Sequence, residues 1–300
     1  MSARYLQLHI DSTLAGRTVD SLLRRHLCLS GTVIRRVKWL EDGITVDGRR
    51  VTVRHLVCEG ETLSVRLTDP VLSSGILPAE GPLDIVCEDE DIIVLNKAPG
   101  VLVHPGHGHF DDTVGNFLLW HYQKNGEECD FHPVHRLDKG TTGLLVAAKH
   151  PHGQETLKNQ LHTGDFRRRY LAVCDGIPSP AAGIIDAPIR LKEGSLMERE
   201  VHPEGQQART RYKVLQTVGT RSLVELELET GRTHQIRVHM AHMGCPLTGD
   251  FLYGTENKAL ISRPALHSAA LDITHPITGQ RMHFELPLPE DMKNLLKKEN

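Results

Sequence analysis

The sequence predicts an α+β protein in two parts, a small α/β module followed by a larger domain with a mainly antiparallel mixed sheet. Two observations predict this fold class. Short apolar strands recur from residue 83 onward with few helices between them, which is typical of antiparallel α+β domains. Residues 69–82, DPVLSSGILPAEGP, hold three prolines, two glycines and two serines, a composition typical of interdomain linkers.

The first 68 residues predict the module. YLQLHI, residues 5–10, alternates apolar and polar side chains, as a half-buried strand does. Thr18 and Ser30 are expected to cap two helices, each with its apolar residues on one face. Asp47-Gly48 then predicts a tight hairpin turn between two strands.

Positive charge is concentrated in this module. Residues 12–67 hold ten Lys and Arg against six Asp and Glu, an excess of four positive charges in a chain whose net charge is -3. Arg35, Arg36 and Lys38 are expected on the outer face of the second helix. Such a face suits contact with nucleic-acid phosphates, and a solvated helix face is the alternative.

The larger domain is expected over residues 83–290, with residues 291–300 as a C-terminal tail. Strands are predicted around an acidic turn in residues 84–97, then at 142–149, 166–176 and twice within 208–228. A helix is expected from about Thr233.

Composition narrows the class of protein. Six scattered cysteines without a C-x-x-C pair indicate reduced thiols in a cytoplasmic protein. No stretch approaches the ~20 apolar residues that span a bilayer, and the first residues lack the apolar core of a signal peptide. We therefore expect a cytoplasmic protein without a membrane partner.

One carboxylate stands out among cations in HRLDKGTTGLLVAAKH, residues 135–150. Asp138 lies between Arg136 and Lys139, immediately before an apolar strand. A carboxylate beside cations stays ionised and can serve as a nucleophile or base. The alternative is a structural ion pair with Arg136 or Lys139 at a turn.

A second motif raises a metal-dependent alternative. His107-x-His109-x-Asp111 resembles the ligand string of metallo-β-lactamase-type hydrolases, but the next residue is Asp112 where that string has histidine. No G-x-S-x-G elbow and no phosphate loop with its lysine is present. The histidines are therefore interpreted as loop residues, with a metal-dependent hydrolase as a rival function.

The motif around Asp138 resembles the active-site motif of the RluA family of pseudouridine synthases, and three further segments resemble family motifs in the same order. They are IIVLNKAPGVLVHPG (92–106), RRRYLAVCDG (167–176) and LETGRTHQIRVHMAHMGCPLTGDFLYG (228–254). The first more usually reads Lys-Pro, whereas Lys97-Ala98-Pro99 displaces the proline by one. Residues 1–68 resemble the alpha-L RNA-binding module of a small-subunit ribosomal protein.

The resemblance implies an enzyme that isomerises uridines in structured RNA, ribosomal or transfer RNA, to pseudouridine. It assigns the catalytic aspartate to Asp138, the active-site tyrosine to Tyr170 and the arginine partner of the aspartate to Arg237, with Arg232 as the alternative. Arg136 would fill the place of the flipped uridine in the RNA stack.

Further RNA contacts are expected from Lys97, Arg167, Arg168 and Arg169, with solvated charges as the alternative for each. The reaction implies no metal and no organic cofactor, and we expect a monomer. A non-catalytic RNA-binding protein is the second rival function.

Overall fold

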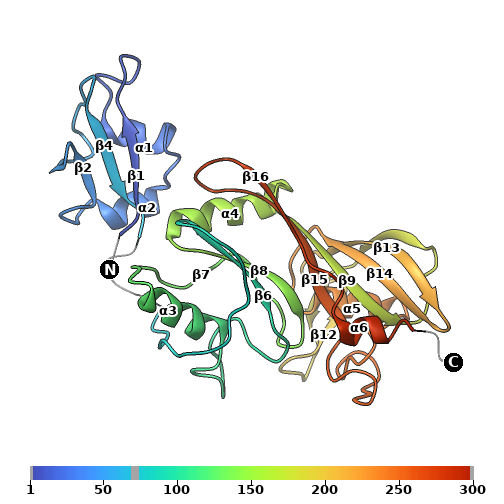
Figure 1. The fold of residues 1–300 in the computed structure, drawn as a ribbon. Coiled ribbons are helices and arrows are strands. Elements are labelled where there is room, and N and C mark those ends of the chain that lie inside the picture. Colours follow the sequence, from blue (N-terminus) through green and yellow to red (C-terminus); the bar gives the residue numbers. More distant parts are fainter. Residues whose placement is uncertain (1–2, 69–73, 298–300) are drawn as a thin grey trace.

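Residues 3–68 fold as a separate small α/β unit in the computed structural model, which describes residues 3–68 and 74–297 (Figure 1). Its antiparallel sheet has the order β1-β4-β2-β3. The elements are β1 (Tyr5–His9), α1 (Val19–Arg25), α2 (Gly31–Val37), β2 (Ile44–Val46), β3 (Arg49–Arg50) and β4 (Thr62–Arg66).

The predicted caps and turn of this unit are confirmed. The Thr18 hydroxyl accepts a hydrogen bond from the Ser21 amide at the start of α1, and the Ser30 hydroxyl accepts one from the Val33 amide at the start of α2. These bonds satisfy amides that a helix leaves without partners. Asp47 and Gly48 have φ angles of 47° and 76°, as a two-residue hairpin turn with left-handed backbone requires.

The larger domain is built on one ten-stranded sheet, with strand order β10-β13-β14-β9-β15-β8-β6-β5; β16 pairs with β15 and β7 with β8. Among the pairs in the described residues, only β8 and β15 run parallel. The α+β class with a mainly antiparallel sheet is therefore confirmed. The strands are β5 (Ile85–Glu88), β6 (Ile92–Lys97), β7 (His132–Pro133), β8 (Thr142–Ala148), β9 (Arg167–Asp175), β10 (Ala182–Asp186), β13 (Arg209–Val218), β14 (Arg221–Leu228), β15 (Leu266–Thr274) and β16 (Arg281–Glu285). A separate pair comprises β11 (Ile189–Leu191) and β12 (Arg199–Val201).

Strand β8 is buried along its whole length because helices cover both faces of the sheet around it. Leu145 packs into the core that includes α3 (Val114–Lys124), whereas Leu144 and Val146 pack into the core that includes Leu157 of α4 (Pro151–Thr163). At Gly143 a Cβ atom would lie 2.2 Å from the Ser268 carbonyl oxygen of β15, so only glycine allows the parallel pair to form.

The predicted linker, residues 69–82, and the predicted tail, residues 291–300, both contribute contacts to the large domain where the structure describes them. Residues 69–73 of the predicted linker lie outside the described residues. The remainder packs against the large domain through Ile76 and through a hydrogen bond that the Ala79 amide donates to the Asn116 carbonyl. The predicted tail is wrong for residues 291–297. Helix α6 (Glu290–Asn294) buries Met292 and Leu295, because these apolar residues at i and i+3 share one helix face.

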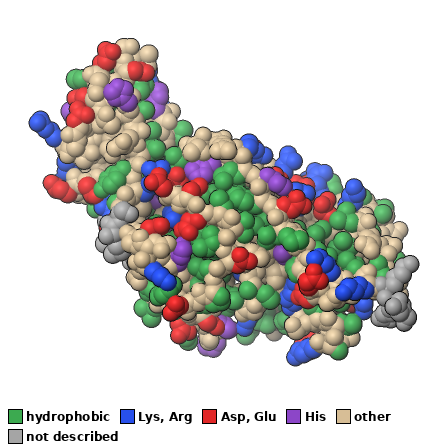
Figure 2. All heavy atoms as spheres, in the orientation of Figure 1, with side chains coloured by type: hydrophobic (Ala, Val, Ile, Leu, Met, Phe, Trp, Pro, Cys, Tyr) green, Lys and Arg blue, Asp and Glu red, His purple; other side chains and the backbone are tan. Residues whose placement is uncertain are grey.

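The module contacts the large domain through ion pairs, and acidic and basic side chains lie next to one another where the two meet (Figure 2). Arg4 donates from Nε to Asp91 at 2.9 Å, and Arg66 pairs with Glu128. Asp91 is 4% exposed and also accepts from His150 Nε2 at 3.1 Å. His150 Nδ1 accepts from the Gly153 amide, which fixes the proton on Nε2.

Two further expectations concern the chain as a whole. All six cysteines are free. Across residues 3–68 and 74–297, every helix is too short or too polar to traverse a lipid bilayer.

Replacing Asp91 with Asn should destabilise the folded protein. Burial alone would raise the pKa of Asp91, but hydrogen bonds from His150 and Arg4 lower it below its usual value. The stabilisation is therefore present above the unfolded-state pKa of about 4 and is lost as pH falls through the folded-state value. Breaking such a buried pair should cost about 3 kcal/mol at pH 7, measured by urea unfolding.

Glu90→Gln is the matched control, because Glu90 also pairs with Arg4 but its side chain is 75% exposed. It should change stability by less than about 0.5 kcal/mol. Equal losses in the two variants would contradict the role of Asp91.

Candidate active site

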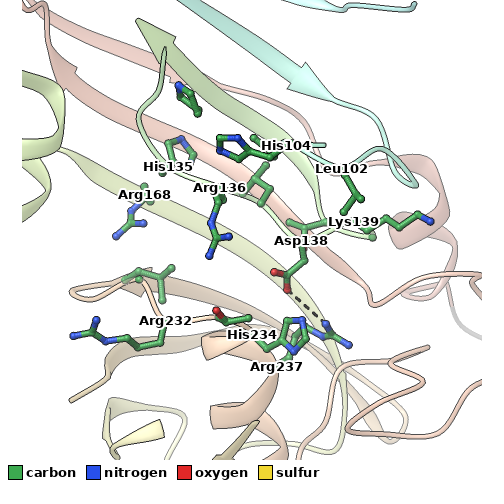
Figure 3. Close-up of a pocket in the computed structure, with 18 of the residues that line it drawn as sticks. Leu102, His104, His135, Arg136, Asp138, Lys139, Arg168, Arg232, His234 and Arg237 are labelled. Carbon is green, nitrogen blue, oxygen red and sulfur yellow. Dashed lines mark ion pairs between the residues drawn. The ribbon is translucent and has the colours of Figure 1, made fainter. Parts of the chain in front are cut away.

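A cavity of about 1350 Å³ opens beside the loop that precedes β8 (Figure 3). Its walls come from segments that are distant in sequence and that the central parallel pair brings together. They include residues 99–106, residues 133–141, one face of α4, β9, residues 228–237 and residues 262–264. Asp138 lines this cavity with its side chain 30% exposed, so a ligand can reach the carboxylate.

The backbone of the Asp138 loop is held from two sides. The Lys139 carbonyl accepts from the Gly100 amide at 2.8 Å and from Lys97 Nζ at 3.2 Å. The Gly140 carbonyl accepts from Arg263 at 3.3 Å, and Arg263 in turn makes a two-bond pair with Asp291 of α6. The helix predicted as a tail therefore supports the loop that carries Asp138.

The predicted contact between Lys97 and RNA is wrong. Lys97 is 3% exposed, and its ammonium donates to the carbonyls of Ala98, Val101 and Lys139. Burial lowers its pKa to about 8 despite the nearby Asp138. Lys97 thus connects the loop of residues 98–101 to the loop that carries Asp138. This structural role follows from the burial of its ammonium group, which the sequence does not show.

The structure places Arg237 beside Asp138. Arg237 lies on α5 (Gln235–His242), and its Nη1 is 3.5 Å from Asp138 Oδ2. Nε and Nη2 donate to the two carboxylate oxygens of the fully buried Asp250, both at 2.7 Å. Asp250 thereby orients the guanidinium, which presents one remaining edge to Asp138.

None of the three alternative partners of Asp138 forms an ion pair with it among the described residues. Arg232 donates from Nε to the Gln207 carbonyl at 2.9 Å. Lys139 Nζ lies 3.0 Å from His109 Nε2. In the described residues, Arg136 makes no ion pair, and it points into the cavity (Figure 3).

The three arginines of β9 are divided between the two faces of the sheet. Alternation along the strand places Arg168 and Tyr170 in the cavity wall, with exposed fractions of 7% and 3%. Arg167 and Arg169 point to the opposite face, where Arg169 lies 3.9 Å from Glu225. RNA contacts of Arg167 and Arg169 stay a prediction, and they would lie away from the cavity.

The phenol of Tyr170 is protonated at neutral pH. Burial raises its pKa above the usual value, and the nearby charge of Asp138 raises it further. The hydroxyl is therefore available as a hydrogen-bond donor, and the ring forms an apolar wall beside the carboxylate.

Sequence reasoning missed several residues of the site. Asp250, within residues 228–254, orients Arg237. Arg263, which follows that segment, holds the Gly140 carbonyl. His234 caps α5 with a left-handed backbone, φ 57°, and its Nδ1 lies 2.8 Å from the Tyr253 hydroxyl. Phe251, 57% exposed, adds an aromatic ring to the cavity. The sequence signal that could have indicated these residues is GDFLYG, which combines an aspartate with two aromatic residues.

The side chains of the His107-x-His109-x-Asp111 motif are not grouped as ligands of a metal ion. His109 Nδ1 is 2.6 Å from Asp112, and its Nε2 faces Lys139. Within the described ranges, one group has metal-like spacing, Asp89 with Asp91 and His275. Arg4 and His150 already occupy the carboxylate of Asp91 there.

The family model, the sequence relatives and a solved structure that this chain resembles are all described as RNA pseudouridine synthases. Residues 91–242 match the family model described as RNA pseudouridylate synthase. An uncharacterized RNA pseudouridine synthase of Bacillus subtilis, YjbO, is 40% identical over 91% of this chain and 96% of its own length. Ribosomal large subunit pseudouridine synthase D of Yersinia pestis is 39% identical over 87% of this chain and 85% of its own. Human RNA pseudouridylate synthase domain containing 4 superposes with a TM-score of 0.57 at 25% identity, covering 70% of this chain and 90% of that one.

Replacing Asp250 with Asn should destabilise the protein more than the loss of a surface pair. The guanidinium of Arg237 would remain buried with one carboxylate partner fewer, at a cost of about 3–5 kcal/mol in unfolding free energy. Asp186→Asn is the control, because Asp186 pairs with Arg209 but is 61% exposed. Urea unfolding at pH 7 measures both, and an Asp250→Asn protein as stable as the control would contradict the buried pair.

Proposed function

Because the chain belongs to the RNA pseudouridylate synthase family, we propose that it isomerises uridines of large-subunit ribosomal RNA to pseudouridine with Asp138 as the catalytic carboxylate. The ribosomal substrate is supported by relatives named as ribosomal large subunit pseudouridine synthases. A cytoplasmic location fits that substrate, and transfer RNA is the alternative.

The observation that carries this proposal is the charge pattern of the cavity. Asp138 is its central carboxylate, and Glu229 at the wall is already paired with Arg209 and Arg211. Five cations that line the cavity have no carboxylate partner among the described residues: Arg136, Lys139, Lys158, Arg168 and Arg232. A cavity with unpaired cations around one reactive carboxylate suits a polyanion that brings an electrophilic sugar or base to Asp138.

The reaction needs one carboxylate because nothing leaves permanently. The carbon–nitrogen glycosidic bond of the uridine breaks, the uracil turns, and a carbon–carbon bond forms through carbon 5. Carbon 5 then loses its proton and the released ring nitrogen gains one, so the composition is unchanged. Asp138 could attack the anomeric carbon, attack the uracil ring, or remove a proton from ribose carbon 2. Each route uses the Asp138 carboxylate as the reacting group, and Arg237 Nη1 at 3.5 Å orients it.

The uridine has to leave its stack to reach Asp138. Tyr170 and Phe251 provide aromatic walls for the extruded base, and the Tyr170 hydroxyl can donate to it. Arg136 projects from the same loop as Asp138, two residues earlier. In this proposal Arg136 fills the vacated position in the RNA stack while the uridine occupies the cavity.

The module would supply affinity for RNA. Arg35 and Arg36 are exposed on α2, and Lys38 follows them at its C-terminal end. Phosphate contacts from these residues make binding dependent on salt.

Asp138→Asn should reduce single-turnover pseudouridine formation by at least about 10³-fold, because the amide retains the shape but not the charge or nucleophilicity of the carboxylate. Binding of in vitro transcribed large-subunit RNA should stay within threefold, about 0.7 kcal/mol. Asp111→Asn is the control from the histidine string and should keep its rate. Activity of Asp138→Asn within tenfold of the natural protein would refute the assignment.

Arg237→Met should slow single-turnover chemistry by about 10²-fold at saturating enzyme, because Asp138 loses the group that orients it. Arg232→Met should stay within threefold in rate, about 0.7 kcal/mol, because its guanidinium bonds to the Gln207 carbonyl. If Arg232→Met were slow and Arg237→Met nearly normal, the partner of Asp138 would be Arg232 and not Arg237.

A further inference from the structure

The module carries an exposed aromatic side chain that no part of the proposed catalytic site uses. Trp39, one of two tryptophans in the chain, follows directly after α2 and is 74% exposed. Lys38 Nζ lies 4.9 Å from the centroid of its ring, and Arg50 donates to its backbone carbonyl. A large aromatic surface held in water beside cations is a common feature of binding sites.

Trp39 lies beyond the C-terminal end of α2. Thr32, Arg35 and Arg36 occupy the i, i+3 and i+4 positions that share one side of this helix, and all three are exposed. Trp39 follows in the turn after Lys38, the C-cap of α2. The apolar side chains of the same helix, Val33, Ile34 and Val37, pack into the core of the module. The exposed face of α2 is therefore polar and cationic, and the indole ring of Trp39 comes next to it in the chain.

This face borders a path to the catalytic cavity. A smaller cavity of about 320 Å³ lies between α2 and α4, and Thr32 and Arg36 line it from the module. Gln154 of α4 lines both this cavity and the one around Asp138. An elongated ligand bound at Asp138 can thus continue along α4 to the outer face of α2. Asp130 and Glu155 of the large domain also line the smaller cavity, so we expect phosphates on the α2 side.

We propose that Trp39 is a stacking platform for an unpaired nucleobase of the RNA whose uridine enters the Asp138 cavity, while Arg35 and Lys38 bind the adjoining phosphates. The proposal rests on the proposed function in one respect, that the module contacts RNA. A flat indole accepts any base through its π face, and neighbouring cations attract the phosphates on either side. The positive excess of the module favours RNA over an apolar protein partner as the occupant of this face.

The first test compares affinities. Trp39→Ala should weaken binding of in vitro transcribed large-subunit ribosomal RNA by about tenfold, as the loss of one base-stacking contact does. Trp39→Phe should retain affinity within about twofold, because it keeps an aromatic face. Heparin, a polyanion without bases, should bind all three proteins alike. The single-turnover rate of pseudouridine formation at saturating enzyme should not change, since Trp39 is outside the catalytic cavity.

The second test uses the fluorescence of Trp39 itself. In a Trp120→Phe background, Trp39 is the only tryptophan, and RNA should quench its emission whereas heparin should not. Unchanged RNA affinity of Trp39→Ala, equal losses for RNA and heparin, or absence of quenching by bound RNA would each overturn the proposal. These readouts are binding measurements, so they remain decisive even if the natural protein were to form no pseudouridine.

Discussion

The fixed position of Asp138 depends on buried cations that are fully engaged with oxygen atoms of the protein. Lys97 and Arg263 hold the backbone of its loop through the carbonyls of Lys139 and Gly140. Arg237, oriented by Asp250, faces the carboxylate itself. Burying such charges is favourable only when each donor finds an acceptor, so the supporting contacts are restricted to one geometry. The Asp138 carboxylate is therefore held in position by the protein itself.

The cations around the cavity differ from these in their partners. Arg136 and Lys158 line it without a carboxylate partner among the described residues, and Arg168 is buried with its Nε unbonded. In the rest of the large domain, ion pairs commonly satisfy arginine and lysine side chains, as Arg190 shows with Glu200 and Glu204. Unpaired positive charge beside one carboxylate links the fold to a polyanionic substrate. Because this charge is local to the cavity, the net charge of -3 for the whole chain does not reveal the substrate.

Local sequence signals predicted much of the fold and part of the site. Caps at Thr18 and Ser30 and the Asp47-Gly48 turn depend on neighbouring residues, and the structure confirms them. The pairing of Arg237 with Asp250 and of Arg263 with the loop of Asp138 depends on tertiary contacts, which periodicity does not encode. Lys97 shows the same limit, because a lysine has the same sequence signature whether its ammonium is buried or exposed.

Mapping pseudouridines in the ribosomal and transfer RNA of a deletion strain tests the central claim most directly. Our account predicts that defined uridines of large-subunit ribosomal RNA lose their modification, that the natural gene restores it, and that the Asp138→Asn gene does not although its protein accumulates and binds RNA. An unchanged pseudouridine map in the deletion strain, or full restoration by Asp138→Asn, would contradict it.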